Sequence, residues 1–132
     1  MEKKIIFHID VNSAYLSWEA VRRLKNGSDV DLRLIPSAVG GDREKRHGII
    51  LAKSPAAKSF GIYTSEPIVS ALKKCPQLKL VSPDFTLYQD NSRKFMEILK
   101  RYAPVVEQYS IDEAFADMTG TTQLYGSYRK AA

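Results

Sequence analysis

The sequence has 132 residues, and its apolar content of 44% is enough for a packed core, which excludes an intrinsically disordered chain. Its length suits one domain of ordinary size or two small lobes. Twenty Lys and Arg residues against fifteen Asp and Glu residues give a net charge of +5, which favours a polyanionic partner such as nucleic acid without requiring one.

The first two predicted elements are a strand and a helix. Residues 4–10 form a short apolar run that ends in a carboxylate, which predicts a buried strand with Asp10 at its C-terminal end. Asn12 or Ser13 can cap the following helix, and Asn26-Gly27 can end it. The larger apolar residues of this helix recur every three positions: Tyr15, Trp18, Val21 and Leu24.

A hairpin and two short helices are predicted next. Residues 32–39 and 48–52 have the composition of strands, and they flank the charged loop GGDREKRH. A helix over 54–60 has Ser54 as its N-cap and a proline at its first position. A second helix is predicted with Ser65 as its cap and a proline beyond its end.

The rest of the chain predicts a strand, a long helix and two more strands. Residues 78–82 are a strand, and residues 84–103 keep helical spacing until a proline stops the helix. Residues 105–109 and 113–118 are strands, and a two-residue turn near 110–111 would lack the favoured Asn-Gly chemistry. The order β-α, ββαα, β-α-β-β predicts a mixed α/β (α+β) fold with two lobes.

Location and redox state follow from what the sequence lacks. No stretch approaches the roughly 18 apolar residues of a membrane span, and the apolar start is too short for a signal peptide. Cys75 is the only cysteine, so no disulfide can form within the chain, and we expect a buried, inert thiol. We therefore expect a soluble, cytoplasmic protein with no membrane partner.

Three acidic residues form the candidate catalytic site. If strand 4–10 pairs with the C-terminal hairpin, Asp10, Asp112 and Glu113 converge at one edge of a sheet. Carboxylates so placed suit Mg²⁺, and two such ions about 3.5–4 Å apart serve phosphoryl transfer. A solvated acidic surface is the alternative interpretation of the same residues.

Three segments carry a family resemblance: FHIDVNSAYLSWE at 7–19, SFGIYTSEP at 59–67 and YSIDEAF at 109–115. Together they resemble the Y-family translesion DNA polymerases, most closely the bacterial DNA polymerase IV branch, over essentially the whole chain. The resemblance implies a partial ferredoxin-like palm with an inserted α/β fingers lobe. The palm would comprise 1–31 and 77–132, and the fingers 32–76.

The resemblance also implies a function. The chain is expected to be an N-terminal fragment, without thumb and little finger, of an error-prone, template-directed DNA polymerase for translesion synthesis and DNA repair in the SOS response. The implied partners are primer–template DNA, deoxynucleoside triphosphates and a sliding clamp, the last through the missing C-terminal part. The fragment alone is expected to be inactive, because too few phosphate contacts would hold a primer.

Site residues are implied position by position. Asp10, the carbonyl of Val11, Asp112 and Glu113 would hold two Mg²⁺ ions. Tyr15, five residues after the first acid, matches the family's steric gate, whose ring collides with a ribose 2′-hydroxyl. Without the resemblance, Tyr15 would be interpreted as a core aromatic.

The triphosphate site departs from the family pattern. Pro55 stands where a tyrosine is usual, and Lys58 replaces an arginine, which keeps the positive charge but loses the bidentate fork. Lys53 either assists or is simply solvated. The candidate template contacts are in the charged loop, which is equally well interpreted as solvated: Arg43, Lys45 and Arg46.

Two other functions compete with the polymerase. One is a non-catalytic nucleotide-binding or nucleic-acid-binding α/β module that retains relic carboxylates. The other is a nucleotidyl cyclase relative, suggested by the Gly-Gly-Asp of the loop, although the residues that follow are of the wrong kind.

Overall fold

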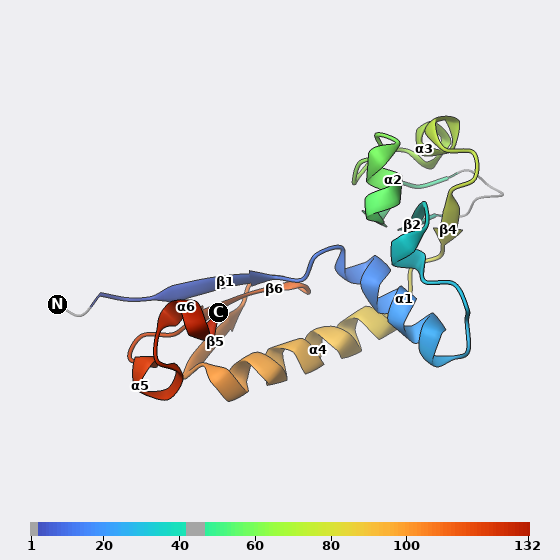
Figure 1. Ribbon diagram of the computed structural model, residues 1–132. Helices are drawn as coiled ribbons and strands as arrows, with labels where there is room; N and C mark the ends of the chain where they lie inside the picture. Colours follow the sequence, from blue (N-terminus) through green and yellow to red (C-terminus); the bar gives the residue numbers. More distant parts are fainter. Residues whose placement is uncertain (1–2, 42–46) are drawn as a thin grey trace. The chain divides into compact units, whose positions relative to one another are not determined.

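The structure, a computed structural model, describes residues 3–41 and 47–132 (Figure 1). Its contacts group the chain into two compact units, Met1–Val11 with Gln89–Ala132, and Asn12–Tyr88. This grouping does not follow the predicted palm and fingers boundaries, which stay a prediction. Of the helices within the described ranges, none has both the length and the apolar character that crossing a bilayer requires.

The first unit contains an antiparallel three-stranded sheet in the order β1-β6-β5 (Figure 1). Its strands are β1 (Ile6–Asp10), β5 (Val105–Gln108) and β6 (Glu113–Asp117). The helix α4 (Phe85–Tyr102) precedes β5 and supplies most of its length to this unit. The buried core here is formed by Ala103, Ala116 and Met118.

The prediction of a buried strand at β1 is wrong on one face. Phe7 and Ile9 are half-buried and pack on the core, whereas His8 and Asp10 are exposed. The alternation follows from the period of two in a strand, since only one face of this sheet is covered. Asp10 does end the strand, as predicted.

Two helices at the end of the chain were not predicted. They are α5 (Thr122–Tyr125) and α6 (Tyr128–Ala131), each of four residues. Gly126, with φ of 85°, separates them in a conformation that favours glycine. The Ser127 side chain then accepts a hydrogen bond from the Lys130 amide at 3.1 Å and caps α6. Helices this short carry no periodic signal in the sequence.

The second unit contains α1 (Ala14–Lys25) and a small sheet in the order β3-β2-β4. The strands β2 (Ser37–Gly40) and β3 (Ile50–Lys53) form the predicted antiparallel hairpin, and β4 (Lys79–Val81) pairs parallel to β2. The predicted helices are α2 (Pro55–Ser59) and α3 (Ile68–Lys74). The core of this unit includes Ala38, Ile50, Ala57, Ile62, Ile68, Ala71, Leu78 and the buried thiol of Cys75.

Two local predictions in this unit are wrong. Leu32–Leu34 is a 3-10 helix rather than the start of a strand, because the Asp31 side chain accepts a hydrogen bond from the Arg33 amide and caps the turn. The strand begins only at Ser37. Ser65 does not cap α3, which starts after Pro67; instead Ser65 has a φ of 76°, in the left-handed region.

The buried face of α1 also differs from the prediction. Val21 and Leu24, two members of the predicted stripe, are exposed, whereas Leu16 and Glu19 are fully buried. Ser13 does occupy the N-cap position, but its φ of 46° is left-handed and its side chain makes no cap hydrogen bond. The period of three in the large apolar residues therefore did not mark the face that packs.

Candidate active site

The pairing of β1 with β6 brings the predicted acids together at one end of the sheet. Asp10 is the cross-strand partner of Glu113, so the two side chains share a face. One step further, the Val11 amide donates a hydrogen bond to the Asp112 carbonyl at 2.9 Å. The predicted pairing of strand 4–10 with the C-terminal hairpin is thus present, with Asp10 opposite Glu113.

Neighbouring polar groups hold the two acids of the hairpin. His8 Nε2 lies 3.1 Å from Glu113 Oε1, and the His8 ring stacks on Phe115 with centroids 4.8 Å apart. Ser110 Oγ lies 3.0 Å from Asp112 Oδ1 and 2.9 Å from Glu113 Oε2. A hydroxyl has one proton to donate, so Ser110 satisfies only one of these acceptors at a time.

The connection between β5 and β6 spans residues 109–112 rather than a two-residue turn. The amides of Tyr109 and Ser110 both donate to the Glu113 carbonyl, at 3.0 and 3.2 Å. This wider loop places Asp112 outside the strand and leaves Glu113 as its first residue. The acids therefore lie at the rim of the sheet, where water and solutes reach them.

The donor set fits a hard cation in kind. Carboxylates from Asp10, Asp112 and Glu113, with the Val11 carbonyl, are the oxygen ligands that Mg²⁺ takes. Among residues 3–41 and 47–132, however, no three His, Cys, Asp or Glu side chains are gathered closely enough to hold a metal ion. Like charges repel, so without a cation the side chains have no reason to converge.

Tyr15 belongs to an aromatic cluster in the second unit. Its ring stacks on that of Tyr88, with centroids 4.3 Å apart and planes 8° from parallel. Phe85 meets Tyr15 edge-on at 6.0 Å, and Trp18 lies 6.4 Å away. Tyr15 is half-buried, so part of its side chain stays open to a ligand.

The sequence analysis missed Glu19, which lies beside this aromatic cluster, and its contact with Tyr88. Glu19 is fully buried and accepts a hydrogen bond from the Tyr88 hydroxyl at 2.9 Å. The available signal was the position of Glu19 four residues after Tyr15, which puts both on one side of α1. Its partner was not predictable, because Tyr88 is 69 positions away.

Among the described residues, the basic ones predicted to bind phosphate make few contacts that would fix their side chains. Lys58 is exposed on α2, and Pro55 occupies the first position of that helix. Lys53 Nζ lies 3.3 Å from the Thr64 hydroxyl, and both interpretations of Lys53 stay open. The three candidate template contacts lie outside the described residues: Arg43, Lys45 and Arg46.

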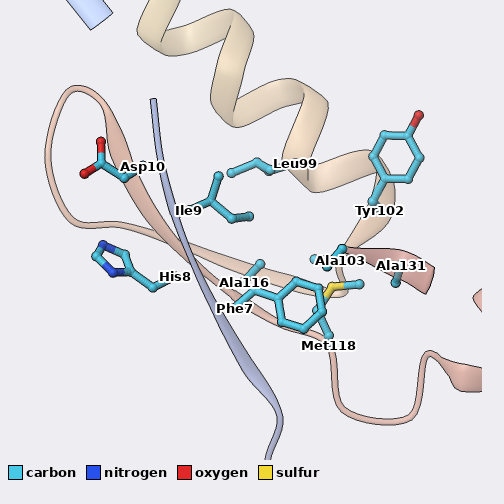
Figure 2. A pocket seen from close by; sticks show the side chains of 11 residues that line it. Phe7, His8, Ile9, Asp10, Leu99, Tyr102, Ala103, Ala116, Met118 and Ala131 are labelled. Atoms are coloured by element: carbon cyan, nitrogen blue, oxygen red, sulfur yellow. The ribbon is translucent and has the colours of Figure 1, made fainter. Parts of the chain in front are cut away.

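A hollow of about 640 Å³ lies on the other face of β1 (Figure 2). Phe7 and Ile9 line it together with Leu99 of α4, whereas His8 and Asp10 point to the opposite side of the strand (Figure 2). Most of the lining is apolar, which does not suit phosphate or metal chemistry. His8 and Asp10 border this hollow as well, but their side chains point away from its apolar interior.

Comparison with known proteins identifies the family. The sequence model of the impB/mucB/samB family matches residues 9–132, and the chain belongs to this family. Curated relatives carry the name DNA polymerase IV. That of Clostridium acetobutylicum is 53% identical over 116 residues, which cover 88% of this chain and 29% of the relative. That of Alkaliphilus oremlandii is 41% identical over 128 residues, 97% of this chain and 31% of the relative. The chain thus spans about 30% of the length of these relatives.

Solved structures share the fold. A Y-family DNA polymerase chimera of Dbh and Dpo4 matches with a TM-score of 0.77 and 23% identity, covering 95% of this chain and 35% of that one. DinB from Sulfolobus solfataricus matches with a TM-score of 0.77 and 21% identity, covering 96% and 34%. The mixed α+β fold predicted from the sequence is therefore confirmed, and the structure builds it with two three-stranded sheets.

Proposed function

We propose that the chain is the palm and fingers part of a template-directed, error-prone DNA polymerase that acts in translesion synthesis and DNA repair. The observation that carries the proposal is the β1–β6 register, which pairs Asp10 with Glu113 and joins Val11 to Asp112. The names of the relatives support it, and so does the resemblance of the three sequence segments. A non-catalytic module with relic acids is not favoured, because the named relatives are polymerases.

The acids would perform the chemistry of nucleotidyl transfer. Two Mg²⁺ ions would be held by Asp10, Asp112, Glu113 and the Val11 carbonyl. When bound, such ions activate the attacking primer 3′-oxygen and stabilise the charge on the departing pyrophosphate oxygen. A bond forms between the 3′-oxygen and the α-phosphorus, and the bond to the β-phosphate oxygen breaks. Because Ser110 can donate to only one of Asp112 and Glu113 at a time, the carboxylate that it does not bind would have an oxygen atom available to a metal ion.

Substrate binding would use residues of both lobes. Tyr15 would reject ribonucleotides by collision with the 2′-hydroxyl. Lys58 would contribute a point charge to the triphosphate, and the charged loop would approach the template through Arg43, Lys45 and Arg46. The resemblance alone supports three further proposals: a sliding clamp partner, a cytoplasmic location and a role in the SOS response.

Primer extension tests the proposal. The test protein is a chimera in which this chain replaces its matching region in Clostridium acetobutylicum DNA polymerase IV, which supplies the remaining length. We expect the chimera to extend a primer with Mg²⁺ present, and Asp112→Ala to abolish extension because one metal-binding carboxylate is lost. The matched control is Glu107→Gln, on the exposed part of β5, which should leave extension unchanged.

Two results would contradict the proposed function. One is an inactive chimera beside an active relative, provided that the chimera is folded by circular dichroism. The other is full extension by the Asp112→Ala variant, which would remove the acids from the chemistry.

A further inference from the structure

Glu19 is a carboxylate that the protein buries and satisfies completely. Its side chain is 0% exposed. Tyr88 Oη donates to Oε1 at 2.9 Å, and Arg22 Nη2 donates to Oε2 at 2.7 Å. Removing a carboxylate from water costs stability even when hydrogen bonds compensate, and an apolar side chain would pack there at lower cost. Packing alone therefore does not explain an acid at this position.

The residue that Glu19 binds is also the residue on which Tyr15 rests. Tyr88 is 0% exposed, one face of its ring stacks on Tyr15 at 4.3 Å, and its hydroxyl is fixed by Glu19. Glu19 follows Tyr15 by four residues, so α1 contacts the Tyr88 ring at two separate points. A ring held at its face and at its end cannot tilt without breaking one contact.

A second hydrogen bond joins α1 to Asp84, the residue just before α4. Arg22 Nη1 donates to Asp84 Oδ2 at 2.5 Å, four residues before Tyr88. Burial, first, and the hydrogen bond to Glu19 raise the pKa of the Tyr88 hydroxyl far above its ordinary value of 10.0. The hydroxyl thus stays protonated and remains the donor to Glu19.

We infer that Glu19 is a positioning residue for selection of the nucleotide sugar: it fixes the Tyr88 ring, and that ring fixes Tyr15. The inference rests on the proposed role of Tyr15 as a steric gate. A gate rejects the 2′-hydroxyl only while its ring stays in place, because a small displacement opens room for one oxygen atom. Loss of the Glu19 hydrogen bond frees Tyr88 to tilt and removes the flat support of Tyr15.

The test measures kcat/KM of the chimera for a ribonucleotide and for the matching deoxynucleotide. Glu19→Leu and Tyr88→Phe should each raise the ribonucleotide to deoxynucleotide ratio about tenfold, the size of effect that a methylene-scale change of fit produces. If Glu19 acts through the Tyr88 hydroxyl, the double variant has the same ratio as either single variant.

Stability separates positioning from a purely structural role. Glu19→Leu leaves the buried Tyr88 hydroxyl without an acceptor, whereas the double variant removes that hydroxyl. We expect the double variant to regain thermal stability and to keep the raised ratio. If the ratio returned to its original value together with the stability, Glu19 would be only structural and the inference would be overturned.

Glu66→Gln is the matched control. Glu66 is also 0% exposed and is held by Lys74 at 2.7 Å and Ser70 at 2.6 Å, outside the aromatic cluster. Its substitution removes a buried carboxylate without touching the support of Tyr15, so the ratio should not change. An equal rise in Glu66→Gln would show general loosening and overturn the inference.

Tyr15→Ala separates failure of this inference from failure of the proposed function. If Tyr15→Ala raises the ratio and the Glu19 and Tyr88 variants do not, the gate stands and Glu19 has no part in it. If Tyr15→Ala leaves the ratio unchanged, the proposed gate fails, and the role of Glu19 fails with it. An NMR measurement adds a direct signature, because ring protons of Tyr15 should lose their ring-current shift in Glu19→Leu and keep it in Glu66→Gln.

Discussion

The acids at the end of the β1–β6 pairing and Glu19, the buried acid of α1, differ in how far water and solutes can reach them. Glu113 has a side chain that is 26% exposed; its Oε1 lies 3.1 Å from His8 Nε2, and its Oε2 shares the single hydroxyl of Ser110 with Asp112. Glu19 is fully buried, and each of its oxygens has a donor. A carboxylate at the rim of a sheet can exchange its partners for a cation, whereas a fully buried one is confined to holding its neighbours in place.

The largest expected effect is on activity at the open acids. If Asp10 has its proposed role as a metal ligand, Asp10→Ala in the chimera should lower primer extension by about a thousandfold or more. The same change should leave the free energy of unfolding equal or higher, because Asp10 faces Glu113 across the strands and repulsion is relieved. Extension rates and urea unfolding check the two halves. An active Asp10→Ala variant would put Asp10 outside the site.

A smaller effect is expected at Tyr15, the proposed steric gate. Tyr15→Ala should raise ribonucleotide use by about a hundredfold and change deoxynucleotide use far less, because it removes one steric collision. Competition between labelled ribonucleotides and deoxynucleotides in primer extension measures this ratio. If both substrates lose activity equally, Tyr15 is a core aromatic of its cluster rather than a gate.

For the free energy of unfolding, the larger effect is expected at Glu19 and the smaller one at the acids of the β1–β6 pairing. Glu19→Ala should lower the free energy of unfolding of this chain by about 2–3 kcal/mol, since it leaves the Tyr88 hydroxyl unpaired and removes one partner of Arg22. Glu113→Ala should change it by no more than about 0.5 kcal/mol, as for an ordinary surface position. Urea denaturation followed by circular dichroism compares them. Equal losses would contradict the distinction between the buried acid and the open acids.

The smallest expected effect is a dependence on pH. The hydrogen bond from Arg22, followed by that from the Leu87 amide, lowers the pKa of Asp84 below its ordinary value of 3.8. A lowered folded-state pKa gives stability that is fully present above the ordinary value and is lost as pH falls through the folded one. Asp84→Asn should therefore flatten the acid side of the stability curve below about pH 4. Curves of equal slope for both proteins would exclude this contribution.

Much of the fold was predictable because its signals are local. Asp10 ends an apolar run, and a serine and a proline mark the start of α2, so β1 and α2 follow from neighbouring residues. The 3-10 turn after Asp31 was not predicted, because a side-chain cap competed with the strand propensity of the apolar residues that follow it.

The site was predictable only in part, for the same physical reason. The acids could be brought together by assuming that β1 pairs with the C-terminal hairpin, and the structure has that pairing. Glu19 was missed, because a polar residue within an amphipathic helix is expected to face water. Its burial depends on Tyr88, a partner 69 positions away, which no local period reveals.

Within β1, the face on which Asp10 lies depends on whether the number of residues before it in the strand is odd or even. Phe7 and Ile9 turn toward the hollow beside Leu99, and Asp10 turns away, because strand residues alternate between faces (Figure 2). Lengthening the strand by one residue before Asp10 would send that carboxylate into the apolar hollow, and lengthening it by two would return it to the open face. An even change of strand length would therefore keep Asp10 on its present face, whereas an odd change would move it to the other.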